Sequence, residues 1–422
     1  MLGILLFCFV IFMLIGMPIA FAMGLSAFLA LLAGDIPLVL VAQRLITSID
    51  SSTLMAVPLF ILAGELMNTG GITRRIIRFS NVLVRHIKGG LSHVTVVTSM
   101  VFASISGSST AAAAAVGSVL IPAMRKEGYG DDVSASVTAS ASTMGPIIPP
   151  SITMIIYASI TNLSIVKLFL AGVIPGILIG LSLLIVNYIY AVKRNYPRQK
   201  RADLHEAWSA FKGAFWALIA PFIIIIGITS GAFTPTEAGA VAVFYALLLG
   251  IFHRETTLKN FWVTLLNTGR KTATILIIIA CASAFGWILT VEQLPVVLVD
   301  FLTSITQNPR ISILLIIILL LFIGMFLEGL TAIMILVPVL APLAATYGFD
   351  PIHFALIFLI TIGIGGVTPP VGVLTFIACG VGNVPLKNLG RTIWIYVLAM
   401  LAVVLLVTYF PPLITYLPSL PK

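Results

Sequence analysis

Two groups of serine, threonine, glycine and proline residues interrupt apolar stretches of this chain and could hold a solute or an ion. The first runs from Ser106 to Ala111 and reads Ser-Gly-Ser-Ser-Thr-Ala; the second runs from Gly145 through a Pro-Pro pair to Ser151. A backbone exposed to lipid must hydrogen-bond within its own helix, which a Gly/Ser turn or a Pro-Pro pair cannot do. We therefore expect both groups to be buried in protein or to line a water-filled cavity, where a membrane protein handles a solute.

The composition places these groups in a polytopic all-α membrane protein. Of the 422 residues, 60% are hydrophobic and only 9% are charged, and long uncharged runs separate the charged clusters. Two apolar regions, 92–125 and 311–346, are split by small polar turns, and we predict that they are re-entrant hairpins. Nine crossings remain, at about 2–33, 54–70, 133–161, 165–192, 214–230, 237–253, 273–290, 350–381 and 392–411.

The basic residues predict how these crossings are oriented. With a cytoplasmic N-terminus, 19 Lys and Arg residues fall on one face and 4 on the other, which is a strong positive-inside bias. This layout predicts a multi-pass protein with its N-terminus in the cytoplasm and its C-terminus in the periplasm. It also explains the net charge of +9, so we expect lipid around the chain and no nucleic-acid partner.

The two halves of the chain repeat the same order of elements. We predict a first inverted repeat over 1–193, with hairpin 92–125 and broken helix 133–161, and a second over 237–422, with hairpin 311–346 and broken helix 350–381. A cytoplasmic loop and linking helix, 194–236, join them. The Gly-rich breaks at Gly145 and Gly365 lie 220 residues apart. Inverted repeats with paired broken helices are typical of secondary transporters, whose site lies at the repeat interface near the midplane.

Helix ends freed at the turns and breaks determine the chemistry that we expect. Exposed N–H groups attract anions, whereas exposed carbonyls and hydroxyls attract cations. We predict an anionic solute between the two hairpin turns, and two Na⁺ sites made of neutral oxygens. The candidate solute-binding residues are Ser108, Ser109, Glu328, Ser151 and Thr368, and the candidate Na⁺ ligands are Ser106, Ser109, Thr110, Gly145, Thr331, Gly365 and Thr368.

The acidic residues favour Na⁺ over a proton as the coupling ion. Proton-coupled carriers relay through Asp, Glu or His within the membrane, and here only Glu65 and Glu328 fall inside apolar regions. Glu328 either faces the solute or caps a helix, and capping is the slightly favoured interpretation. Glu237, in Thr-Pro-Thr-Glu, is predicted to cap the helix that it begins.

Other classes of membrane protein fit less well. A channel normally repeats its filter around an oligomeric pore, and an intramembrane hydrolase needs a His or Lys beside its serine or an HExxH zinc motif. Ser108 and Ser109 have no such base in their apolar surroundings, so we do not expect an enzyme. A stand-alone Na⁺/dicarboxylate symporter shares the hairpin design and stays open as the alternative.

An ordered set of motifs covers essentially the whole chain. The motifs are Ala-Val-Pro-Leu-Phe-Ile-Leu-Ala-Gly from Ala56, Asn-Thr-Gly-Gly-Ile from Asn68, Ser-Gly-Ser-Ser from Ser106, Gly-Pro-Ile-Ile-Pro-Pro-Ser from Gly145, Thr-Pro-Thr-Glu from Thr234 and Thr-Pro-Pro from Thr368. As a set they are more specific than any one alone, and with them the chain resembles the large membrane subunit of tripartite ATP-independent periplasmic (TRAP) transporters.

The resemblance implies an elevator-type carrier in the bacterial inner membrane, with a transport domain that moves against a scaffold. It implies a small four-helix membrane subunit, expected as a separate chain, and a soluble periplasmic substrate-binding protein that delivers the solute. It implies Na⁺-driven uptake of an organic acid such as sialic acid or a C4-dicarboxylate. The second hairpin turn carries Glu328 where relatives specific for sialic acid carry Asp, so the resemblance does not fix the solute.

Overall fold

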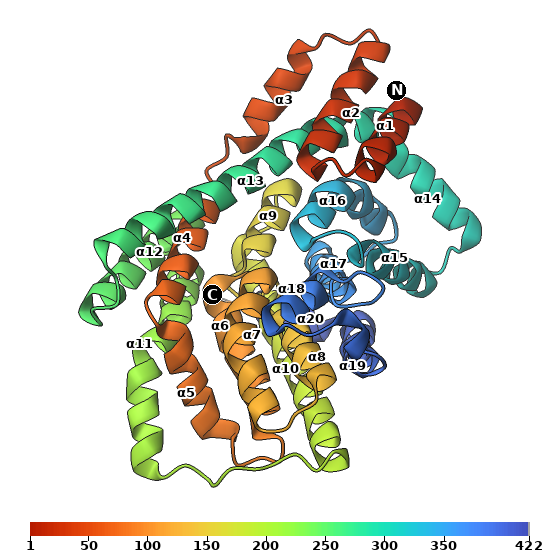
Figure 1. Cartoon of the computed structure of the whole chain (residues 1–422). Coiled ribbons are helices and arrows are strands. Elements are labelled where there is room, and N and C mark those ends of the chain that lie inside the picture. Colours follow the sequence, from red (N-terminus) through yellow and green to blue (C-terminus); the bar gives the residue numbers. More distant parts are fainter. Residues whose placement is uncertain (421–422) are drawn as a thin grey trace.

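The computed structural model describes residues 1–420, and every regular element in that range is a helix (Figure 1). The first half contains α1 (Leu2–Leu14), α2 (Ile19–Ala33), α3 (Val39–Ile49), α4 (Ala56–Thr69), α5 (Ile72–Val84), α6 (Gly90–Ser106), α7 (Ser109–Lys126), α8 (Asp131–Ser142), α9 (Ile152–Thr161) and α10 (Ile165–Lys193). The rest contains α11 (Leu204–Thr229), α12 (Pro235–Phe252), α13 (Leu258–Val291), α14 (Leu294–Ile305), α15 (Pro309–Gly324), α16 (Gly329–Thr346), α17 (Pro351–Gly365), α18 (Val373–Gly382), a short 3₁₀ turn η1 (Leu386–Asn388), α19 (Thr392–Tyr409) and α20 (Pro412–Ser419).

Five of the nine predicted crossings are single helices of membrane-spanning length and hydropathy. They are α10, α11, α12, α13 and α19. Helix α16 also has the required length and hydropathy, but it follows the second polar turn as the return arm of a hairpin. Helices α4 and α5 together pass the same test but are bent by 69° at their junction. The prediction of an all-α membrane protein is confirmed.

The polar turns and the Gly/Pro groups interrupt the helices where the sequence predicts. We call residues 106–111 the first tip and 324–331 the second tip. Helix α6 ends at the left-handed Gly107 (φ 59°), and α7 restarts with Ser108 as its N-cap. We call 145–151 the first break, between α8 and α9, and 365–372 the second break, between α17 and α18. Left-handed Gly372 (φ 61°) precedes α18, so a side chain at either glycine would strain the turn.

The halves are interlocked through the second segment of each broken helix. Helix α9 of the first half packs on α16 of the second, and α18 of the second half packs on α7 and α8 of the first. Helix α4 packs on both α12 and α13 on one side of these tips. We call the surface of α4 and α13 that faces the tips the α4–α13 wall.

The predicted first crossing, 2–33, is wrong. Gly16 is left-handed (φ 86°) and Pro18 follows it, so the run folds into two short helices, α1 and α2, that pack on each other. The Leu2 backbone N–H donates to Glu292, just beyond the end of α13, at 2.9 Å. Helix α13 carries Lys271 at the other end of its apolar stretch. The N-terminus therefore lies beside the end of α13 that is opposite Lys271.

A polar cluster joins the two halves at the basic face. Arg194, after α10, donates to both oxygens of Asp132 at 2.8 and 2.6 Å, and Thr392 Oγ1 of α19 donates to the same carboxylate at 2.5 Å. Deeper in the molecule, Tyr396 Oη donates to Asn187 Oδ1 at 2.6 Å. These bonds tie α8, α10 and α19 into one body that carries both broken helices.

Candidate functional site

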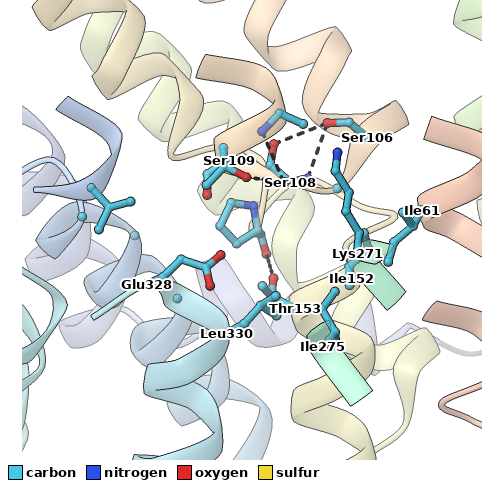
Figure 2. Close-up of a pocket in the computed structure, with 18 of the residues that line it drawn as sticks. Ile61, Ser106, Ser108, Ser109, Ile152, Thr153, Lys271, Ile275, Glu328 and Leu330 are labelled. Carbon is cyan, nitrogen blue, oxygen red and sulfur yellow. Dashed lines mark hydrogen bonds between the residues drawn. The ribbon is translucent and has the colours of Figure 1, made fainter. Parts of the chain in front are cut away.

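A cavity of about 380 Å³ lies between the two tips and the α4–α13 wall. Figure 2 shows its lining residues converging from the first tip, the second tip, the start of α9 and α13. Its volume falls within the range of about 300–1,000 Å³ that is usual for small-molecule sites. Its lining contains residues from both halves of the chain.

Four helix N-termini meet at this cavity. Its lining includes the first residues of all four helices that restart after a tip or a break: Ser109 and Thr110 of α7, Ile152 and Thr153 of α9, Gly329 and Leu330 of α16, and Val373 and Leu374 of α18. Each N-terminus carries unpaired N–H groups and the positive end of a helix dipole. The arrangement favours a bound anion.

Hydroxyl groups of the first tip hold its turn together. Ser108 Oγ accepts from the Ala111 backbone N–H at 3.3 Å and lies 3.1 Å from Thr110 Oγ1. Ser106 Oγ accepts from the Ser108 N–H at 3.4 Å. An N-cap serine satisfies one N–H of the first helical turn, so the remaining N–H groups and the Ser109 hydroxyl are left for a ligand.

Each tip touches the break of its own half through the backbone. A Cβ added to Gly145 would lie 2.6 Å from Ser108 C and Ser109 N, and one added to Gly365 would lie 2.7 Å from Gly324 Cα. The Gly372 N–H also donates to the Met325 carbonyl at 3.0 Å. Only glycine permits these contacts, which bring the backbones of tip and break close together in both halves.

Some of the site residues that the sequence predicts line the cavity, and the others are buried outside its lining. Ser106, Ser108, Ser109, Thr110 and Glu328 line the cavity. The others, Gly145, Ser151, Thr331, Gly365 and Thr368, are buried and lie outside its lining.

Two of these buried hydroxyls are already hydrogen-bonded to backbone carbonyls. Ser151 Oγ donates to the Pro146 carbonyl at 2.9 Å, and Thr368 Oγ1 donates to the Ile364 carbonyl at 2.8 Å. Both side chains use their single donor within the protein. In this conformation neither residue reaches a solute in the cavity, although each hydroxyl oxygen keeps lone-pair capacity for a cation.

Glu328 and Glu237 have different roles in the structure. Glu237 caps its helix as predicted: it accepts from the Thr234 N–H at 2.8 Å, and its own N–H donates to Thr234 Oγ1 at 3.3 Å. Glu328 occupies the N-cap position of α16 but its side chain accepts no capping bond. Figure 2 shows its carboxylate directed into the cavity from the second tip. The favoured capping interpretation of Glu328 is therefore wrong.

Sequence reasoning missed most of the α4–α13 wall. Glu65 and Asn68 of α4 and Arg270, Lys271 and Thr274 of α13 line the cavity, and Lys271 Nζ forms an ion pair with Glu65. The available signal was Glu65 inside an apolar span together with two basic residues where the α13 apolar stretch begins. Nothing in the sequence indicated that positions 206 residues apart meet.

Comparison with known proteins identifies the family. Residues 6–413 match the DctM component of the tripartite ATP-independent periplasmic transporters. The sialic acid TRAP transporter large permease protein of Vibrio cholerae is 40% identical, over 96% of this chain and 95% of that protein. The C4-dicarboxylate TRAP transporter large permease protein of Pseudomonas aeruginosa is 40% identical, over 90% of this chain and 89% of that protein.

A third relative is longer than this chain. The isethionate TRAP transporter permease protein of Oleidesulfovibrio alaskensis is 39% identical, over 96% of this chain, and the chain spans 64% of its length. Among solved structures, the YdaH transporter of Alcanivorax borkumensis shares the fold, with a TM-score of 0.65 at 13% identity, covering 87% of this chain and 86% of that one. This chain therefore belongs to the DctM component family of the tripartite ATP-independent periplasmic transporters, a family of transport proteins and not of enzymes.

Proposed function

We propose that this chain moves an organic acid anion into the cell, driven by Na⁺. The observation that carries the proposal is the convergence of four helix N-termini on one cavity between the halves. Such an arrangement stabilises a carboxylate through backbone N–H groups and the positive ends of helix dipoles. The hydroxyls of Ser108 and Ser109 supply hydrogen bonds to the same solute.

The tip and break of each half form the proposed Na⁺ site. The backbones of tip and break come into close contact where Gly145 meets Ser108 and where Gly365 meets Gly324. Neutral oxygens from an unwound backbone are suited to Na⁺ in transporters of this design. Hydroxyls of Ser106, Ser109 and Thr110 in the first half, and of Thr331 and Thr368 in the second, complete the two sites.

Transport follows an elevator mechanism in this proposal. The interlocked body with both hairpins and both broken helices slides against α4, α12 and α13, and the cavity lies between the two. A small four-helix membrane subunit completes the scaffold, and a periplasmic substrate-binding protein delivers the solute. The family name, which specifies a tripartite periplasmic system, supports both partners.

The inner membrane is the proposed location, with the basic loops in the cytoplasm. We propose a periplasmic N-terminus in place of the cytoplasmic one expected from the sequence, and the contact between Leu2 and Glu292 supports this. Tyr409 Oη donates to the Arg310 carbonyl at 3.2 Å, which places the end of α19 beside the start of α15. The C-terminus is accordingly assigned to the periplasm too.

The proposed solute class is an organic acid. Relatives of similar identity are named for sialic acid, C4-dicarboxylates and isethionate, and these solutes share an anionic group on a small polar skeleton. We propose a carboxylate solute of the sialic acid or C4-dicarboxylate type.

Uptake into proteoliposomes tests the proposal. The chain is reconstituted with its small subunit and supplied with binding protein and labelled sialic acid or succinate. We expect uptake only with binding protein present and an inward Na⁺ gradient. Uptake without the binding protein would favour the stand-alone symporter, and uptake that follows a proton gradient alone would overturn Na⁺ coupling.

A further inference from the structure

The α4–α13 wall carries an ion pair at the cavity that the proposed function does not yet use. Lys271 of α13 and Glu65 of α4 form this pair, and both side chains line the cavity. Figure 2 shows Lys271 extending from α13 towards the first tip near Ser106. Arg270 lines the cavity beside it, so the wall presents two positive groups and one negative group to the solute.

This ion pair is open to solvent on its lysine side. The Lys271 side chain is 53% exposed and that of Glu65 is 20% exposed, and ion pairs in contact with water contribute little net stability because solvent competes for both partners. A lysine ammonium on its flexible four-carbon chain can change partners with little rearrangement of the backbone. The pair is therefore free to exchange when another anion arrives.

An organic acid in the cavity would bring such an anion. On the tip side, the solute meets helix N-termini and the carboxylate of Glu328, which repels it unless a cation lies nearby. On the wall side, it meets Lys271 within the same cavity. Glu65 is the competitor for that ammonium group, since the two side chains form an ion pair.

We infer that Lys271 is a solute-binding residue. Its ammonium group leaves Glu65 and binds the carboxylate of the organic acid. Glu65 competes for the ammonium group and so limits the affinity for the solute. The inference rests on the proposed function. Because Lys271 belongs to the wall and the N-termini belong to the moving body, this contact exists only while the cavity faces the wall as it does here. A competitor that weakens the contact favours release of the solute.

Binding measurements on four variants test the inference. The chain, purified with its small subunit in detergent, is titrated with labelled sialic acid and with succinate at saturating Na⁺. We expect Lys271→Gln to weaken binding about fivefold, Lys271→Arg to stay within about twofold of the wild type, and Glu65→Gln to tighten binding about two- to fivefold. The double variant Glu65→Gln/Lys271→Gln should bind like Lys271→Gln alone.

The opposite directions of the affinity changes expected for Lys271→Gln and Glu65→Gln distinguish a solute-binding role of Lys271 from a purely structural role of the ion pair. If the ion pair only holds α4 against α13, both single variants lose affinity and thermal stability together, and the double variant recovers part of the loss; that pattern would overturn the inference. Wild-type binding that Lys271→Gln leaves unchanged would also overturn it while the proposed function stands. No binding of either acid by the wild type would remove the proposed function and this inference together. Should Lys271→Gln fail to fold, Glu65→Gln and Lys271→Arg still decide by the direction of their shifts.

Discussion

The two tips have similar backbone surroundings and very different side chains. The first tip carries four hydroxyl residues in five positions, from Ser106 to Thr110, whereas the second reads Gly-Met-Phe-Leu-Glu-Gly from Gly324. Yet each tip abuts the break of its own half where only glycine fits, at Gly145 and Gly365. The repeated part is thus backbone geometry, which suits a pair of ion sites. The unrepeated side chains suit a single asymmetric solute.

Adding a methyl group at the tip–break contact should have the largest effect on uptake, and the effect should be equal in both halves. Gly145→Ala places Cβ 2.6 Å from the Ser108 backbone, and Gly365→Ala places it 2.7 Å from Gly324 Cα. Overpacking of this kind costs about 1–3 kcal/mol, so we expect Na⁺-driven uptake in proteoliposomes to fall about fivefold or more in each variant.

Gly380→Ala is the matched control for these two variants. Gly380 lies in α18, and a Cβ added to it would have no neighbouring atom within 4 Å, so uptake by this variant should equal that of the wild type. A fivefold loss at Gly145 with normal uptake at Gly365 would show that the halves are not equivalent in their backbone contacts. Protein yield in the membrane, measured in parallel, separates lost transport from lost folding.

Removing the charge of the second tip should have the next largest effect on uptake. Glu328 is directed into the cavity without a capping bond, and a carboxylate is rarely kept in such a place without a partner to bind. We expect Glu328→Gln to lower uptake about fivefold, and Glu328→Asp to retain more of it. If Glu328→Gln transports like the wild type, the side-chain difference between the tips has no role in transport.

Hydroxyl deletions compare the ion sites proposed for the two halves. Ser109→Ala and Thr331→Ala each remove one ligand oxygen, so the Na⁺ concentration for half-maximal uptake should rise about three- to tenfold in both. Ser118→Ala is the control, since Ser118 lies exposed on α7 and donates to its own helix at Ala115. An unchanged Na⁺ response in both Ser109→Ala and Thr331→Ala would sink the assignment of ligands at the tips.

The sequence was most informative where polar or proline-containing groups interrupt long apolar runs. Such interruptions are costly in lipid, so the tips at Ser106 and Glu328 and the breaks at Gly145 and Gly365 could all be placed within a few residues. The fold of α1 on α2 was missed because Gly16 and Pro18 are uncharged and the run 2–33 is long enough for one crossing.

The α4–α13 wall could not be predicted for a different reason. The meeting of Glu65 with Lys271 depends on how α4 packs against α13, and tertiary packing of this kind leaves no periodic signal in either segment. The same applies to Ser151 and Thr368, whose residue types fit a ligand site. Only the structure shows that their hydroxyls donate to the carbonyls of Pro146 and Ile364.

The smallest effects are expected on thermal stability, from variants of the acidic residues at the starts of α8 and α17. Asp132 binds Arg194 and Thr392 of neighbouring elements, whereas within residues 1–420 Asp350 accepts only from the first N–H groups of its own helix, at 3.0 and 2.8 Å. Asp132→Asn should lower the thermal unfolding midpoint in detergent by about 2–5 °C. Asp350→Asn should change it by less than about 1 °C, because asparagine caps a helix nearly as well as aspartate.

The pH dependence of this difference identifies its cause. Burial raises the pKa of the Asp132 carboxyl, but the bonds from Arg194 and Thr392 outweigh burial and hold that pKa below its usual range. An acid whose pKa is lowered on folding stabilises the protein above its unfolded pKa of about 4, and the stabilisation is lost as pH falls through the folded pKa. The midpoint of Asp132→Asn should therefore stay below that of the wild type between pH 7 and 5, and the gap should close below about pH 4. If the difference between the two midpoints persists unchanged at pH 3, Asp132 acts through packing and not through its charge. The charge of the polar cluster would then stabilise the contact between the halves no more than the cap at Asp350 stabilises its helix.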